Sequence, residues 1–414
     1  MMHLVLLAAL AAYGVVAVPI QAEHDLGNIV FASVLFRHGD RAPTSSYPND
    51  PYNDVAKYWP RGYGQLSEIG EEQHYRLGSY LRQRYSDLLP LTYNTNDTYI
   101  RSTDVDRTLV SARCNLEGLY PPTERTLSQP SIRFQAIPIH TETSSNDDLI
   151  VPFYNCAKYT TLSSYLKLTD EYQCVVNATA QVLEEVAEFA GTTTSSASGL
   201  HDVLFIEELY NLTLPDWVKP YYPQPLRNIE LLEGFISAAG TTQLQRLSAG
   251  PVLKQMIENM QNKLNGTLSP DRKLYIYSAH DSNVVNLLQA LKVFNGQLVP
   301  YASAVIIELR EKLGSPYVTV SYKNSTETEP YLLQLPGCAH LCPLDRFVEL
   351  TKEVVPDDEA TECAEAVEEG ETMDFQVPSA AILPEWEHCF NEPKILFGFK
   401  HHVISFKIPF FKLL

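Results

Sequence analysis

The apolar run Ile29–Phe36 ends abruptly in the segment Arg37–Arg41, which reads Arg-His-Gly-Asp-Arg. Such a run is typical of a strand buried on both faces, so the charged residues must lie where the strand leaves its sheet. Two guanidinium groups there can hold a phosphoryl group by forked hydrogen bonds while the neutral imidazole of His38 attacks its phosphorus. Gly39 is expected to let the backbone approach the anion closely. The segment predicts a phosphate-binding loop, with ordinary ion pairs at a strand end as the simpler alternative.

The same change from a strand to polar residues occurs twice more. One strand is expected to end at Arg101, before the capping residues Ser-Thr-Asp and a helix, and another to end before His280 and Asp281. A long helix is predicted from about Ser67 to Tyr85. Ligands of α/β proteins bind in the crevice beyond the carboxyl ends of the strands. We therefore expect an α/β fold in which the three polar clusters meet.

Together these clusters contain the groups that phosphate ester cleavage needs. The nucleophile would form a phosphohistidine, three arginines would neutralise the phosphoryl oxygens, the second histidine would donate to the phosphate and the carboxylic acid would protonate the departing alkoxide. Because a carboxylic acid with an ordinary pKa is protonated only in acid, this scheme predicts an acid optimum. In that order of roles, the catalytic candidates are His38, Arg37, Arg41, Arg101, His280 and Asp281.

Other polar residues near these clusters are expected to be structural. Asp104 and Arg107 lie one helical turn apart and can pair or cap a helix, and His74 can cover its own helix. No cluster of His and Asp residues has the spacing of a two-metal phosphatase, so we expect neither a metal ion nor any other cofactor.

The chain has 414 residues, which exceeds the size at which one core usually keeps growing. Residues 132–230 are less regular than their flanks and contain helical pieces, which predicts an inserted, mainly helical cap domain. The α/β catalytic domain is then expected to comprise residues 23–131 and 231–363. Residues 364–414 form an acidic and then irregular extension without a long uncharged run, so a membrane anchor is not expected.

The N-terminal residues 1–22 resemble a signal peptide in the length of their apolar stretch, with cleavage after Ala17 or after Ala22. Secretion is the expected location, because five Asn-x-Ser/Thr sequons for glycosylation follow. A formal net charge of −19 argues against nucleic acid or an anionic membrane as a partner. The sequons lie at Asn96, Asn177, Asn211, Asn265 and Asn324.

Seven cysteines without any Cys-x-x-Cys pair indicate disulfides rather than metal ligands in a secreted chain. Cys338 and Cys342 are close enough in sequence to close a local loop. The odd number leaves at least one thiol unpaired or intermolecular.

The three polar clusters resemble the signature of the histidine acid phosphatases, and the similarity extends from about residue 28 to 363. Several further segments resemble the prostatic and lysosomal branch of that family, and also secreted invertebrate and venom acid phosphatases. The signature segments are Arg37–Pro43, Arg101–Asp104 and His280-Asp281, and the further ones are Pro60–Leu66, Glu72–Tyr75, Pro300–Ser303 and Pro336–Cys338.

The resemblance implies a phosphoglycerate mutase-like fold, with a mixed, mainly parallel sheet, helices on both faces and a smaller helical domain. It also implies a metal-independent enzyme that is a homodimer, with the six candidates on the family's catalytic positions. The disulfides that it implies are Cys338 with Cys342 and Cys156 with Cys363. A third bridge of this branch is missing, since Ala304 stands at one partner's position, and Cys114, Cys174 and Cys389 stay unassigned.

We therefore expect an acid phosphatase that acts on small phosphate monoesters, secreted or alternatively lysosomal. A phytase-like phosphatase is the nearest alternative, but the expected cap has only Lys158, Lys167 and Lys219 as lysines to bind so anionic a substrate. A secreted binding or antigenic protein of the same fold with little turnover is the alternative from another class.

Overall fold

The apolar run Ile29–Phe36 forms most of strand β1 (Asn28–Arg37), inside a mixed sheet of seven strands among the residues that the structure describes. The structure is a computed structural model, and it describes residues 26–123, 133–367, 374–378 and 381–390. The strand order is β2-β3-β1-β4-β5-β6, with β7 beside β5. The other strands are β2 (Thr98–Ser102), β3 (Leu274–Ala279), β4 (Ala304–Lys312), β5 (Ser315–Lys323), β6 (Tyr331–Leu333) and β7 (Cys342–Pro343).

The parallel strands form the part of the sheet that leads to the polar clusters. β1 and β2 both pair in parallel with β3, in a register that sets Arg37 opposite Ala279 and Ser102 opposite Ser278. The three polar turns therefore leave the sheet at one edge. β4, β5, β6 and β7 add antiparallel pairings, so the mixed α/β fold is confirmed but parallel pairing is confined to three strands.

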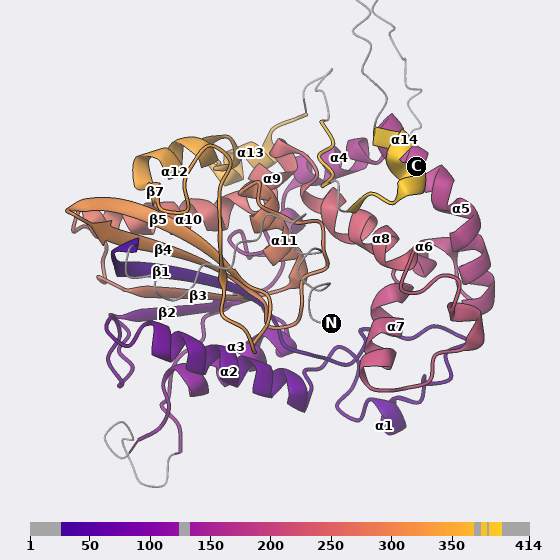
Figure 1. The fold of residues 1–414 in the computed structure, drawn as a ribbon, viewed down its shortest axis with the longest axis horizontal. Helices are drawn as coiled ribbons and strands as arrows, with labels where there is room; N and C mark the ends of the chain where they lie inside the picture. The colour runs from indigo at the N-terminus through magenta and orange to yellow at the C-terminus, as the bar shows by residue number, and fades with distance from the viewer. Residues whose placement is uncertain (1–25, 124–132, 368–373, 379–380, 391–414) are drawn as a thin grey trace, which may run out of the picture.

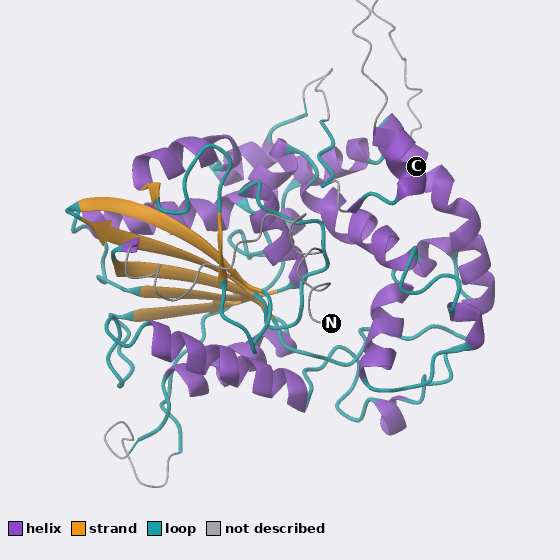
Figure 2. Ribbon diagram, viewed as in Figure 1, coloured by secondary structure: helices purple, strands orange, loops and turns teal. Residues whose placement is uncertain are grey.

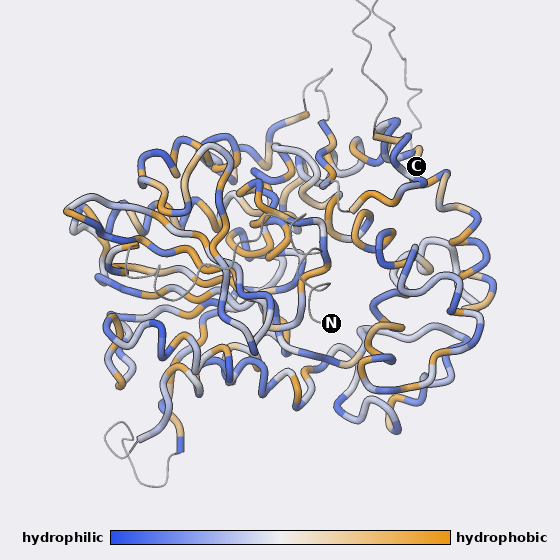
Figure 3. The backbone as a smooth tube through the Cα atoms, viewed as in Figure 1, coloured by the Kyte–Doolittle hydropathy of each residue, from blue (hydrophilic) through white to orange (hydrophobic). Residues whose placement is uncertain are grey.

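Helices cover both faces of the sheet, with α2 and α3 on one face and α10, α11 and α12 on the other (Figures 1 and 2). Side chains of β1 alternate between these layers: Val34 packs with the core beneath α2 and α3, and Leu35 packs with the opposite core. Figure 3 shows the hydrophobic stretches of the sheet between helices of mixed hydropathy. Burial on both faces explains why the sequence of β1 does not alternate.

The helix predicted from about Ser67 is present as α2, and Ser67 Oγ caps it by accepting from Gly70 N at 3.0 Å. The helices on the faces of the sheet are α2 (Glu68–Arg84), α3 (Asp106–Leu119), α10 (Gly250–Leu264), α11 (Asp281–Ala290) and α12 (Leu344–Thr351). The remaining helices are α1 (Val55–Tyr58), α4 (Ala157–Leu166), α5 (Asp170–Ala190), α6 (Thr194–Ala197), α7 (Leu200–Leu209), α8 (Leu226–Glu230), α9 (Thr242–Ser248), α13 (Glu359–Ala364) and α14 (Glu387–Phe390).

A second, mainly helical part lies beside the sheet and contains α5, α6, α7 and α8 (Figure 1). Its hydrophobic core also includes Tyr47, Ile236 and Trp386, which lie outside residues 132–230. The limits proposed for the cap and for the two catalytic segments stay a prediction. The expected leader, residues 1–22, and the end of the expected extension, residues 391–414, lie outside the described residues.

The described chain contains three disulfides, of which two join distant parts and one closes a local loop. They are Cys156–Cys363, Cys338–Cys342 and Cys174–Cys389, of which the first two are the pairs that the family resemblance implies. The Cys114 thiol is free and half-buried. Disulfides of this kind are formed in the secretory pathway. Among the described residues, no helix is both long and apolar enough to cross a bilayer.

Candidate active site

Four chain segments meet at the carboxyl edge of the parallel strands. His38 follows β1, Thr103 follows β2, and His280 follows β3. His38 N donates to Ala279 O at 3.0 Å, and Thr103 N donates to Ser278 O at 3.1 Å, so both turns extend the sheet pairing. The segment before β4 arrives from the opposite direction and brings Tyr301 to the same edge.

The imidazole of His38 is buried, with 1% of the residue exposed. Its Nδ1 lies 2.8 Å from the backbone oxygen of Gly39. Because a carbonyl can only accept, Nδ1 carries the proton and Nε2 keeps a free lone pair. Burial, and after it the positive charge of Arg37, lowers the pKa of His38 well below its usual value. The ring is therefore held neutral, with one nitrogen ready to act as a nucleophile, even in acid.

Arg37 and Arg41 flank His38, and both are buried. Arg37 donates to Val299 O at 2.6 Å, pairs with Asp281 at 2.8 Å and lies over the Tyr301 ring at 4.1 Å. Arg41 is held from the helical part by a two-pronged pair with Asp202, with both N–O distances 3.1 Å. Both guanidiniums are thus fixed before any anion arrives.

Gly39 is required by the packing of the loop against α2 (Glu68–Arg84). A Cβ at this position would lie 2.4 Å from the backbone oxygen of Gly70 in α2. The glycine therefore allows α2 to pack against the catalytic loop. Asp40 N, next in the loop, donates to Gln73 Oε1 of α2 at 2.8 Å, and His74 Nε2 of α2 lies 3.1 Å from Arg37 O.

His280 and Asp281 lie at the N-terminus of α11. His280 Nε2 lies 3.0 Å from Thr103 Oγ1, and its ring meets that of His38 edge-on at 5.6 Å. Burial, with Arg107 second, lowers the pKa of His280 to about 4. Burial alone would raise the pKa of Asp281, but the charges of Arg37 and Arg41 outweigh it and lower that pKa below its usual value. Without substrate, Asp281 is therefore an ionised partner of Arg37.

The structure does not place Arg101 in this cluster, because its guanidinium lines neither of the two cavities that open there. Arg101 pairs with the buried Asp147 at 3.1 Å and lies 3.8 Å from Glu142. Arg107, which we expected to be structural, occupies the site instead. It lies in the first turn of α3, with Nη2 3.5 Å from His280 Nδ1, and its charge contributes to the lowered pKa of His38. Arg101 lies within β2, opposite Tyr277 of β3, whereas Arg107 lies beyond the strand, in the first turn of α3, and lines the cavity that contains His38.

Two adjoining cavities open at this cluster. A small one of about 240 Å³ is lined by His38, Arg41, Arg107 and His280, and a larger one of about 580 Å³ is lined by Arg37. Asp281 lines both. The small cavity has the cations and the imidazoles that a phosphoryl group requires, and the larger has room for the rest of a substrate.

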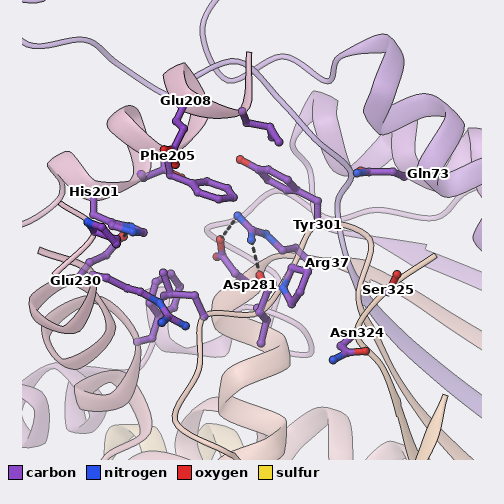
Figure 4. Close-up of a pocket in the computed structure, with 18 of the residues that line it drawn as sticks. Arg37, Gln73, His201, Phe205, Glu208, Glu230, Asp281, Tyr301, Asn324 and Ser325 are labelled. Carbon is purple, nitrogen blue, oxygen red and sulfur yellow. Dashed lines mark hydrogen bonds and ion pairs between the residues drawn. The ribbon is translucent and has the colours of Figure 1, made fainter. Parts of the chain in front are cut away.

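The outer wall of the larger cavity comes from the helical part (Figure 4). His201 and Phe205 of α7 face Tyr301 across this cavity. A carboxylate oxygen of Glu230 in α8 lies 2.7 Å from His201 Nδ1, within hydrogen-bond distance. The opposite rim is formed by residues 324–326, directly after β5. No local pattern in the sequence identifies Asp202 or His201 as site residues, because their proximity to the loop arises only from the tertiary fold. Tyr301 lies in Pro300–Ser303, a segment that resembles the family but that gave Tyr301 no role.

One cluster of possible metal ligands occurs among the described residues, formed by Cys174, His388 and Cys389. It joins α5 to α14, outside the candidate site. Both of its cysteines are in one disulfide and so offer no thiolate to an ion.

Residues 28–331 match the family model of the histidine phosphatase superfamily, branch 2. The chain is 40% identical over 341 residues to prostatic acid phosphatase of Rattus norvegicus, covering 80% of this chain and 88% of that one. It is also 40% identical over 361 residues to lysosomal acid phosphatase of Rattus norvegicus, covering 86% of this chain and 84% of that one.

Solved structures of low sequence identity share the fold. The phytase from Citrobacter braakii has a TM-score of 0.62 at 19% identity, and the alignment covers 82% of this chain and 100% of that chain. Hafnia alvei phytase in complex with tartrate has a TM-score of 0.60 at 18% identity, covering 81% and 98%. At these identities the similarity concerns the fold alone.

Proposed function

Since this chain belongs to branch 2 of the histidine phosphatase superfamily and is a metal-independent acid phosphatase that cleaves phosphate monoesters through a phosphohistidine, we propose that His38 is the residue that becomes phosphorylated. The observation that carries this assignment is the hydrogen bond from His38 Nδ1 to Gly39 O. It leaves Nε2 as the attacking atom, and the lowered pKa of His38 keeps that atom unprotonated in acid.

The phosphoryl group is held by Arg37, Arg41 and Arg107, with His280 as a further neighbour. Three cations around a buried nucleophile match the charge that develops on the three phosphoryl oxygens. The ion pairs of Arg37 with Asp281 and of Arg41 with Asp202 support this assignment, because they fix both guanidiniums in advance. Little reorganisation is then needed when the substrate binds.

Asp281 is the proton donor to the leaving group, and it acquires its proton with the substrate. The bound phosphate takes over the positive charge of Arg37 and adds a negative charge of its own beside Asp281. Both changes favour the protonated carboxylic acid. Below about pH 6 a phosphate monoester is itself a monoanion that carries the required proton.

In the first step His38 Nε2 forms a bond to phosphorus, the bond from phosphorus to the ester oxygen breaks, and Asp281 transfers its proton to that oxygen. In the second step the Asp281 carboxylate accepts a proton from a water molecule whose oxygen attacks the phosphohistidine. The bond from phosphorus to Nε2 breaks, and phosphate and neutral His38 are released. No oxidant, reductant or metal ion is required.

Trapping the phosphoenzyme tests the assignment. Rapid acid-free quenching with a ³²P-labelled monoester is expected to label the wild-type protein in a bond that is stable to base and labile to acid. The His38→Asn variant, folded by circular dichroism, is expected to carry no label and to have lost activity. Label in that variant, or label on a different residue of the wild type, would refute the assignment.

The larger cavity favours small monoesters with an apolar or aromatic leaving group. Phe205 and Tyr301 line it, and the acids Glu208 and Glu230 line it together with one outer cation, Arg227. A polyanion such as the substrate of a phytase would meet those acids, so the phytase-like alternative is disfavoured. The intact cluster around His38 likewise supports turnover over the alternative of a binding or antigenic protein.

Location, assembly and finer kinship are further proposals about this chain. We keep secretion as the proposed location, with the lysosome as the alternative that the name of one relative suggests. The homodimer and the likeness to invertebrate and venom acid phosphatases rest on family resemblance. Assay of the culture medium of expressing cells tests the location, and sedimentation equilibrium tests the assembly.

A further inference from the structure

The sequon Asn324-Ser325-Thr326 lies on the rim of the larger cavity. All three residues line it together with Arg37 and Asp281, and Asn324 is exposed. Figure 4 shows Asn324 and Ser325 on the side opposite His201 and Glu230. We propose that Asn324 carries an N-linked glycan that screens the mouth of this cavity, so that small phosphate monoesters enter while phosphorylated proteins are excluded. The proposal rests on the assignment of this cavity to the leaving group.

The root of the glycan is fixed by the structure around it. Asn324 directly follows Lys323, a buried residue of β5 that pairs with Ala304 at the active-site edge of the sheet. The loop that begins there is closed by Lys323 Nζ, which donates to Thr328 O at 2.5 Å, and it contacts α2 through the exposed pair of Arg76 with Glu327. A sugar on Asn324 is therefore attached to an anchored part of the rim.

The Asn324 side chain is also free to carry a sugar. The described structure gives its amide no hydrogen-bond partner, and the residue is exposed, so a glycan on Nδ2 displaces no contact. The sequon hydroxyl of Thr326 contacts only the exposed Glu327, at 3.3 Å. Nothing in the described fold requires a bare asparagine at this position.

The other four sequons have no such relation to the substrate, since none of their asparagines lines either cavity of the site. Asn96 precedes β2, and Asn265 caps the C-terminus of α10 in the segment leading to β3. Both positions belong to the amino edge of the parallel strands, away from His38. Asn265 therefore offers a matched control, at which a glycan can be removed without affecting the cavity mouth.

Size is the basis of the expected selectivity. A leaving group such as nitrophenol fits within a cavity of about 580 Å³. A phosphoserine in a protein must instead bring its own chain up to the rim, where a bulky, hydrated glycan occupies the approach. Obstruction of this kind slows association and leaves the chemical steps at His38 unaltered.

The experiment compares glycoforms of the full chain expressed through a secretory pathway. Mass spectrometry of the peptide containing Asn324 is expected to detect a glycan in the wild type and in Thr326→Ser, and none in Asn324→Gln or Thr326→Ala. Loss of the glycan is expected to raise kcat/KM for phosphorylated casein by about tenfold relative to kcat/KM for 4-nitrophenyl phosphate. Thr326→Ser, which keeps the sequon, is expected to keep the wild-type ratio of the two kcat/KM values, and Asn265→Gln is expected to match the wild type on both substrates.

The possible results separate clearly. An unmodified Asn324 in the secreted protein, or an unchanged ratio of the two kcat/KM values, would overturn the proposal. So would an effect of Asn324→Gln that Thr326→Ala does not reproduce, since it would belong to the side chain and not to the glycan. Failure of the proposed catalytic function is read separately, from the absence of ³²P label on His38 in the wild type.

Discussion

Two arginines that lie six residues apart, Arg101 and Arg107, give the sharpest test of the site. Arg107→Ala removes a cation that lines the cavity containing His38. Loss of one preorganised donor to a developing charge typically lowers kcat by about 10²–10³-fold, or roughly 3–4 kcal/mol. Arg107 has no carboxylate ion pair among the described residues, and burial lowers its pKa, so the fold gains little from its charge. We expect the thermal midpoint of this variant to equal or exceed that of the wild type.

Arg101→Ala is expected to have the opposite pattern. It leaves the Asp147 carboxylate, which is 0% exposed, without its cation. Removal of one partner from a buried pair typically costs about 3–5 kcal/mol of folding free energy. Asp147 Oδ1 also accepts from Ile150 N at 3.0 Å and from Leu149 N at 3.2 Å, so the lower end of that range, about 3 kcal/mol, applies here. Because Arg101 does not line either cavity, the kcat of the folded variant is expected to stay within about threefold of wild type.

Both variants are to be measured in the same two assays, denaturant unfolding and initial rates with 4-nitrophenyl phosphate, at a temperature at which both are folded. Lysine substitutions serve as controls, since Arg107→Lys keeps the charge in the cavity and Arg101→Lys keeps it beside Asp147. If Arg101→Ala lost kcat while Arg107→Ala kept it, our placement of the two side chains would be refuted.

Two further predictions concern titrating groups. Asp281→Asn is expected to lower kcat for alkyl phosphates by about 10²–10⁴-fold and to affect 4-nitrophenyl phosphate much less, because a good leaving group does not need a proton; equal losses in steady-state assays of both would contradict the role of Asp281 as the acid. Burial, with Asp50 second, raises the pKa of Glu207 from 4.5 to about 8, so the folded protein holds a proton that the unfolded chain releases. The stability that this proton contributes is fully present below pH 4.5 and is lost as the pH rises to about 8. In Glu207→Gln the thermal midpoint is expected to fall less over this pH range than in the wild type. The same fall in both proteins would argue against a protonated Glu207.

The parts of the site that follow strands of the parallel core could be predicted from the sequence. The apolar run before Arg37 and the switch before His280 each identify the end of a buried strand, and parallel strands end at one edge. Placing His38, His280 and Asp281 together needed no more than that. The direction of a side chain at the end of a strand does not follow from the position of that end. It depends on which face of the pleated sheet the residue occupies. That is why Arg101 was misplaced although its strand was correctly expected.

The remaining residues of the site come from elements whose position no local pattern reveals. Tyr301 reaches the edge because β4 is antiparallel to β1, so that the start of β4 meets the end of β1. Asp202 lies 161 positions from its partner Arg41 and belongs to helix α7 of the helical part. The disulfide between Cys174 and Cys389 spans 215 positions and likewise had no signal in the spacing of the cysteines.

The structure gives a reason for activity at acid pH that differs from the one expected from the sequence. An acid optimum was expected from the need to protonate a carboxyl group of ordinary pKa, yet the charges of Arg37 and Arg41 lower the pKa of Asp281 below its usual value. The free protein thus has a neutral His38 beside an ionised Asp281, which is ready to attack but not to donate a proton. In the proposed mechanism a substrate monoanion supplies the missing proton, and the abundance of this monoanion falls as the pH rises above about 6. On this reasoning the alkaline decline in kcat/KM follows the second pKa of the substrate, and it should shift when monoesters of different phosphate pKa are compared.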